Sequence, residues 1–221
     1  MNHKFYSKSK KEQNQILMKI GFGSLILNVI MAAIAIITGW YIIVMLSVII
    51  TISIIAPFFD IPALKNKGKL IYYSSLFIVE EEKNGVIIIH GGSLFDYVFV
   101  IDQGLSGTQR TNFILQKYLE GILNLIEDCE KKQNTSVKIK GTSYVLNERT
   151  AHKIGLNIIK TDLLQTLILI FNYPNILISN SIAKGKVSFP RIGNIKTFES
   201  ELKELIGRKE FIRDLSNKLK T

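Results

Sequence analysis

The sequence predicts a membrane α-helical hairpin of two transmembrane helices, followed by a cytoplasmic α/β (α+β) domain with a mixed, mainly antiparallel sheet. Two observations predict this fold class. Residues 20–59 contain no Asp, Glu, Lys or Arg, and this run is about twice the roughly 20 apolar residues needed to cross a bilayer core. Beyond it, short runs rich in Ile, Val, Tyr and Phe alternate with amphipathic stretches, a pattern typical of strands and helices that share one core.

The apolar run divides into two helices, predicted at residues 20–38 and 41–59, with a very tight turn at Gly39 and Trp40. A cleaved signal peptide would have a shorter apolar region that ends at a small-residue cleavage site, whereas here one apolar stretch runs directly into the next. Trp40 and Tyr41 are the predicted interface anchors, because an aromatic ring with a polar edge favours the headgroup region.

Lysines flank both ends of the hairpin. Positive segments are retained on the cytoplasmic side, so both termini are expected in the cytoplasm and the protein in the cytoplasmic membrane. Anionic lipid attracts basic segments, which makes the lipid bilayer the partner of the basic segment 1–19. The lysines are Lys4, Lys8, Lys10, Lys11 and Lys19 before the first helix, and Lys65, Lys67 and Lys69 after the second.

Polar residues occur within both predicted spans. Folding the hairpin about its turn places Asn28 level with Thr51, and Ala32 level with Ser47. Small residues permit close approach of helices, and polar side chains in lipid seek partners across the interface. Asn28, Thr51 and Ser47 are therefore expected to pack the two helices together. Alternatively, Asn28 faces a second protomer or a pore.

Two prolines, Pro57 and Pro62, bracket Asp60. Proline lacks an amide donor and restricts the residue before it, so the second helix is expected to end here. Residues 60–69 are then a linker and residues 70–195 the α/β domain.

Three successive strands are predicted at residues 70–79, 86–89 and 94–101, because these runs are rich in β-branched and aromatic residues. The links contain Asn84-Gly85 and Gly91-Gly92, which tolerate positive φ. Antiparallel pairing of neighbours follows.

The rest of the domain alternates helices and strands. A loop at 103–110 leads into an amphipathic helix between Leu115 and Cys129. A strand at 136–146, a short helix at 148–154 and a strand at 156–160 follow.

The last part of the chain contains two further apolar segments. Residues 163–178 are apolar but too short to span a bilayer, so they form either a buried core helix or a segment that lies in or dips into the membrane. Residues 196–221 read as a C-terminal amphipathic helix that caps the domain or pairs protomers.

No catalytic or metal site is evident in the sequence. The histidines are His3, His90 and His152, and their surroundings lack metal-site spacing. Residues 90–93 (HGGS) resemble the HGGG oxyanion element of lipases and esterases, but no G-x-S-x-G elbow accompanies them, so they are interpreted as a tight turn. The acidic residues at 80–82 are interpreted as a solvated loop. The net charge of +10 comes without a recognised nucleic-acid motif.

Residues 70–160 resemble the GNAT superfamily of acyl-CoA-dependent N-acyltransferases in the order of their elements. In that family, backbone amides of a Gly-rich loop cradle the CoA pyrophosphate at a helix start. Residues 103–108 (QGLSGT) occupy that place, so the resemblance implies acyl-CoA as cofactor and Gly104 and Gly107 as its ligands. Residues 147–156 (NERTAHKIGL) are similar to the family's N-x-x-A…Y-x-K-L-G-F segment, with Ala151 in place of the tyrosine acid.

These observations favour a membrane-anchored interaction, scaffold or sensor protein whose domain binds a protein partner, a ligand or a second copy at the bilayer surface. The alternatives are a membrane-tethered acyltransferase of the GNAT type and an oligomeric membrane effector or pore. A splayed pair of parallel strands beside the loop that begins at Gln103 would favour the transferase, and its absence would leave the binding module.

Overall fold

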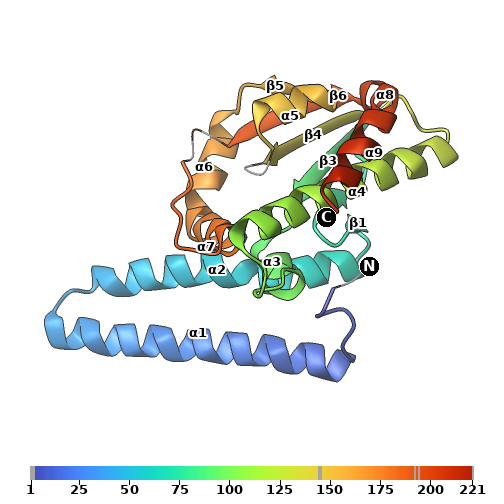
Figure 1. Cartoon of the computed structure of the whole chain (residues 1–221). Coiled ribbons are helices and arrows are strands. Elements are labelled where there is room, and N and C mark those ends of the chain that lie inside the picture. Colours follow the sequence, from blue (N-terminus) through green and yellow to red (C-terminus); the bar gives the residue numbers. More distant parts are fainter. Residues whose placement is uncertain (1–2, 144–145, 192, 194, 221) are drawn as a thin grey trace.

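The computed structural model describes residues 3–143, 146–191, 193 and 195–220. Two long helices, α1 (Lys10–Thr38) and α2 (Ile42–Asn66), run side by side in opposite directions, and an α/β domain packs along the second half of α2 (Figure 1). The ends of the predicted basic segment and C-terminal helix, residues 1–2 and 221, lie outside the described residues, as do residues 144–145 of the predicted strand at 136–146.

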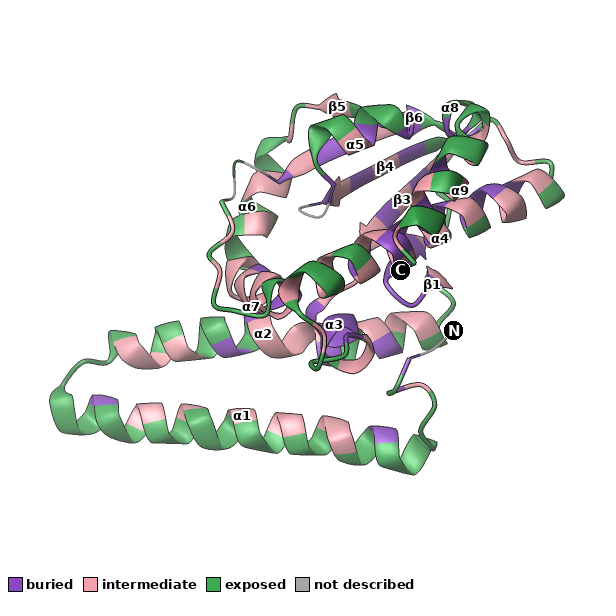
Figure 2. Cartoon of the chain, viewed as in Figure 1, coloured by how far each residue is buried: buried purple, intermediate pink, exposed green. Residues whose placement is uncertain are grey.

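Both hairpin helices are long and apolar enough to cross a membrane. Ser9 begins α1 with a capping box to Glu12, and Gly39 ends it in the left-handed conformation (φ 75°), which glycine adopts without a steric penalty. Most of the surface of α1 and of the first half of α2 is exposed (Figure 2). Apolar residues exposed on this scale suit lipid rather than water.

The prediction that the prolines end the second helix is wrong, because α2 continues to Asn66 through Pro57 and Pro62. Each proline removes one backbone hydrogen bond. Phe58 and Pro62 are buried, and α2 packs against the domain over this stretch. Tertiary packing therefore holds the helix, and most of the predicted linker at 60–69 is helical.

One six-stranded sheet forms the centre of the domain, in the order β1-β2-β3-β4-β6-β5. β3 and β4 are parallel, and every other neighbouring pair is antiparallel. This is the mixed, mainly antiparallel sheet that the sequence predicts. The strands are β1 (Leu70–Ser74), β2 (Phe77–Glu80), β3 (Val86–Gly91), β4 (Lys138–Ser143), β5 (Asn157–Ile159) and β6 (Lys196–Glu201).

Seven helices of the described residues accompany the sheet. The long helix α4 links β3 to β4, which is the crossover that a parallel pair requires. The helices are α3 (Leu94–Val100), α4 (Gly107–Lys131), α5 (Glu148–Lys153), α6 (Leu163–Phe171), α7 (Tyr173–Lys184), α8 (Leu202–Gly207) and α9 (Lys209–Lys218).

Three further sequence predictions need correction. Residues 70–79 form a hairpin of two strands rather than one strand. Residues 94–101, predicted as a strand, contain α3, because a capping box between Ser93 and Asp96 starts a helix and a short apolar run alone does not distinguish the two structures. Residues 196–201 are strand β6, inserted between β4 and β5. Such long-range pairing leaves no local signal in the sequence.

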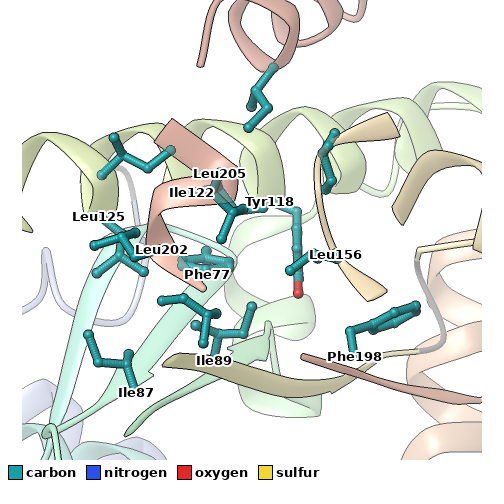
Figure 3. Close-up of a cluster of buried hydrophobic side chains, with 14 of the residues drawn as sticks. Phe77, Ile87, Ile89, Tyr118, Ile122, Leu125, Leu156, Phe198, Leu202 and Leu205 are labelled. Carbon is teal, nitrogen blue, oxygen red and sulfur yellow. The ribbon is translucent and has the colours of Figure 1, made fainter. Parts of the chain in front are cut away.

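The main core lies between the sheet and α4, with α5, α8 and α9 contributing (Figure 3). Phe77 stacks edge-on against Tyr118, with ring centroids 4.9 Å apart. Gly121 of α4 faces Phe77 so closely that an added Cβ would lie 2.3 Å from the Phe77 Cβ. This glycine lets α4 approach the sheet.

A second core joins the domain to the hairpin. Phe5 of the N-terminal segment and Phe58 of α2 both pack on Phe95 of α3, with ring centroids 4.9 and 5.8 Å apart. Phe5 and Phe95 are fully buried. The N-terminal segment and the end of α2 are therefore parts of the domain's packing.

Candidate functional site at the divergence of two parallel strands

The parallel strands β3 and β4 separate at their carboxyl ends. Their pairing runs to Ile89 opposite Gly141. Beyond this point β3 continues against β2, with His90 opposite Ile78, while β4 continues against β6, with Thr142 opposite Thr197. Ligands of α/β proteins bind at the carboxyl ends of parallel strands, so this divergence is a candidate site.

A cavity of about 360 Å³ lies at the divergence, within the range of about 300 to 1,000 Å³ typical of small-molecule sites. One part of its wall is apolar and another carries polar side chains, so the cavity fits a ligand that has an apolar portion and a reactive polar portion. The apolar part consists of Ile61, Leu64, Leu70, Ile78 and Tyr97, and the polar part of Glu80, His90, Ser93, Thr142 and Ser143.

Strand alternation explains how His90 reaches the cavity. Successive side chains of a strand point to opposite faces of the sheet. Ile87 and Ile89 belong to the core under α4, so His90 lies on the other face. There, Ile61 and Leu64 from the end of α2 complete the wall. The cavity therefore lies between the sheet and the helix that the sequence places at the membrane exit.

Glu80 and His90 form a pair in this cavity, with 2.8 Å between Glu80 Oε1 and His90 Nε2. They are diagonal neighbours on β2 and β3, within reach of long side chains. The hydrogen bond from His90 holds the pKa of Glu80 below its usual value. When Nε2 donates its proton to this carboxylate, Nδ1 carries the lone pair of a general base.

The backbone of Gly91 lines the cavity next to His90. The carbonyl of Gly85 accepts the Lys138 amide at 2.8 Å, and the Ile89 carbonyl lies against Gly141, where an added Cβ would be only 2.5 Å away. Backbone groups of alternate residues point to the same side. The Gly91 amide therefore points toward the edge of β3 along which β4 pairs, but it lies beyond the last β3–β4 pair, Ile89 and Gly141.

The residues implied by the acyl-CoA resemblance lie elsewhere. The Gly104 amide donates to Asp102 Oδ1 at 2.9 Å, and an added Cβ on Gly107 would lie 2.1 Å from the Lys184 carbonyl of α7. Arg110 hydrogen bonds with the carbonyls of Gln103, Leu105 and Ile182. These groups are engaged within the protein, so residues 103–108 do not fit a pyrophosphate.

The sequence predicts a tight turn at residues 90–93, whereas the structure places these residues at the divergence and at the start of α3. The run of β-branched residues before His90, followed by Gly91-Gly92, is the signal that marks the end of a buried strand. The partner strand β4 is remote in sequence, so its approach could not be read from this run.

Two of the predicted helix-packing residues, Asn28 and Ser47, contact each other across the hairpin, which differs from the expected pairing. Ser47 Oγ donates to Asn28 Oδ1 at 2.9 Å, and Asn28 Nδ2 donates to the Ser24 carbonyl. Thr51, the expected neighbour of Asn28, is buried one turn further along the same face of α2. Counting residues from the turn assumes level helices, and the observed pairing is offset by about one helical turn. Trp40 and Tyr41 are exposed at the turn.

The Asn28–Ser47 hydrogen bond should stabilise the hairpin. We expect Ser47→Ala to lower the stability of the helix pair by about 0.6 to 2 kcal/mol, as for other hydrogen bonds between helices in lipid. Unfolding of the full chain in bilayer discs, in a double-mutant cycle with Asn28→Ala, measures the coupling. A coupling of zero would show that the bond contributes nothing.

No group of three or more His, Cys, Asp or Glu side chains arranged to hold a metal ion occurs among the described residues. Cys129 is buried on α4 and is not in a disulfide. Comparison of the chain with protein-family models, curated proteins and solved structures finds no match.

Proposed function

We propose that this chain is a membrane-anchored acyltransferase that binds an acyl thioester in the cavity between β3 and β4. In this proposal α1 and α2 span the cytoplasmic membrane, both termini are cytoplasmic, and the α/β domain is held against the inner surface. The observation that carries the proposal is the Glu80–His90 pair at the divergence of the only parallel strands among the described residues.

The apolar part of the cavity wall suits the acyl chain of an acyl thioester, and the polar part suits its thioester group. The apolar wall from Ile61, Leu64 and Ile78 accommodates an acyl chain, and the thioester carbonyl then reaches the polar end with His90 and Ser143. Because α2 supplies part of the wall, an acyl chain would enter close to the membrane surface.

In the reaction that this geometry supports, an acceptor amine or hydroxyl attacks the thioester carbonyl. Its proton passes to Nδ1 of His90, the carbon–sulfur bond breaks as the carbon–nitrogen or carbon–oxygen bond forms, and His90 returns the proton to the departing thiolate. Glu80 orients the imidazole and stabilises its charged form. The Gly91 amide supports the negative charge that develops on the carbonyl oxygen.

Binding and turnover of an acyl thioester test this proposal. Full-length protein in bilayer discs is mixed with palmitoyl-CoA or with free CoA, and unfolding temperature and release of free thiol are followed. We expect stabilisation by the acyl thioester, since a ligand at 100 times its dissociation constant adds about 2.7 kcal/mol, and thiol release when an amine acceptor is present. Absence of both effects would refute the proposal.

The second candidate is a binding or sensor module that holds an acyl ligand without turnover. The engaged loop at 103–108, which leaves no pyrophosphate cradle there, favours it. In the same experiment this candidate gives stabilisation by the acyl compound with no thiol release above the rate without protein.

A further inference from the structure

A bent, apolar pair of helices lies beside α2. The helices α6 and α7 meet at a 68° bend around Asn172, and the segment after α7 adds further exposed apolar side chains. Each helix is too short to cross a bilayer. The exposed apolar residues are Leu163, Leu164, Leu167, Ile168, Ile170 and Phe171 on α6, and Val187 and Phe189 after α7.

The bend is bonded to the apolar part of α2. Ser53 Oγ donates to the carbonyl of Phe171 at 3.0 Å, and Ser53 is 1% exposed. Ser53 precedes the end of the uncharged run at Phe59 by six residues, which is roughly 9 Å along a helix. If α2 spans the membrane, the end of α6 therefore lies below the surface of the hydrocarbon core.

Polar backbone groups at the bend have protein partners. Besides Phe171, the Ile168 carbonyl accepts both the amide and the side-chain Nδ2 of Asn172, each at 3.0 Å. The Asn172 carbonyl accepts the amide of Ile176 at 3.0 Å. An irregular backbone is tolerated at membrane depth when its polar groups are satisfied by protein. The carbonyls of Ile168, Phe171 and Asn172 meet this requirement.

The charges around the segment also suit a membrane surface. Between Lys160 and Arg191, Asp162 is the single acid, while Lys184 and Lys186 join the two flanking cations. All four cations are exposed. Basic residues that border an exposed apolar face are typical of segments that lie at an anionic bilayer surface.

We propose that α6 and the α6–α7 bend insert into the cytoplasmic leaflet as a re-entrant segment, with lipid acyl chains as the occupant of the exposed apolar face. This inference rests on the membrane-spanning hairpin of the proposed function. It fixes the domain at a second point beside α2 (Figure 1). The cavity between β3 and β4 is then held at a constant distance from the lipid.

Tryptophan fluorescence with nitroxide-labelled lipids tests the depth of the bend. Trp40 is the only tryptophan, so Phe171→Trp and Phe211→Trp are each made with Trp40→Phe, and the full chains are placed in phosphatidylcholine–phosphatidylglycerol vesicles. Phe211 on α9 is a matched control, because it is also a half-exposed aromatic residue. We expect several-fold stronger quenching by acyl-chain nitroxide for F171W than for F211W, and weaker quenching by aqueous iodide.

Two results would overturn the inference. Equal quenching of F171W and F211W by nitroxide would place the bend in water. Protection of F171W from both nitroxide and iodide would show that protein, such as a second copy, covers the face. Leu167→Trp repeats the measurement on α6 if F171W does not fold. Nitroxide quenching of Trp40 in the unmodified chain reports on the hairpin separately, so a failed anchor is distinguished from a failed re-entrant segment.

Discussion

Replacing His90 by glutamine lowers the rate constant for acyl transfer by roughly 10²- to 10⁴-fold, the usual contribution of a positioned general base. Glutamine keeps a polar side chain of similar reach but does not accept a proton at neutral pH. Because His90 lines the cavity without filling it, the affinity for the acyl thioester changes little. Steady-state kinetics with palmitoyl-CoA and an amine acceptor give kcat and KM separately.

His152→Gln is the matched control, since His152 is exposed on α5 and is absent from the cavity lining. It should leave both constants unchanged. Glu80→Gln should reduce kcat less than His90→Gln, because the imidazole remains but loses the carboxylate that orients it. Equal rates for His90→Gln and the unmodified chain would remove His90 from the mechanism and leave the binding module as the better description.

The sequence predicted those parts of the fold that local patterns encode. Each of these features can be recognised from residues that are close together in the sequence. They are the uncharged run at 20–59, the apolar face of α4 and the glycine at 155 after α5. The helix α3 was missed because its apolar residues surround it on all sides, so their spacing carries no helical period. Strand β6 was missed because its register against β4 and β5 is set by contacts distant in sequence.

The candidate site was harder to predict for the same reason. Glu80 and His90 were both noted in the sequence, but as a solvated acid and a turn residue. Their pairing depends on the register of β2 against β3. The cavity further depends on Gly141, which permits close contact with Ile89 before the strands separate. The contact between β2, β3 and β4 cannot be predicted from single residues or short motifs.

A buried carboxylate at the junction of the N-terminal segment and the domain is expected to contribute strongly to the stability of the domain. Asp96 is fully buried. It accepts hydrogen bonds from the Ser93 amide and hydroxyl, both at 2.7 Å, and from the Tyr72 hydroxyl at 2.6 Å. His3 Nε2 lies 3.2 Å from the same carboxylate. Burial and the charge of Asp96 raise the pKa of Tyr72, so the phenol keeps the proton that it donates.

Asp96→Ala should therefore lower the free energy of unfolding of the domain by about 3 to 5 kcal/mol, the loss expected when one partner is removed from a buried charged network. The substitution leaves the buried His3 and the partly buried Tyr72 without this acceptor and removes the capping box of α3. Urea unfolding of the full chain in detergent micelles measures the change. Limited trypsin digestion follows release of the N-terminal segment, since Lys4, Lys8 and Lys10 lie beside the docked Phe5.

The control is Asp102→Ala, an acid on an exposed loop whose carboxylate accepts the amide of Gly104. Exposed substitutions of this kind cost about 0.5 kcal/mol or less. Equal stability of the Asp96 and Asp102 variants would show that the buried network is energetically neutral. A large loss confined to Asp96, with faster cleavage near Lys8, would show that this carboxylate fastens the N-terminal segment to β1 and α3. The start of α1 would then be held to the domain independently of the membrane.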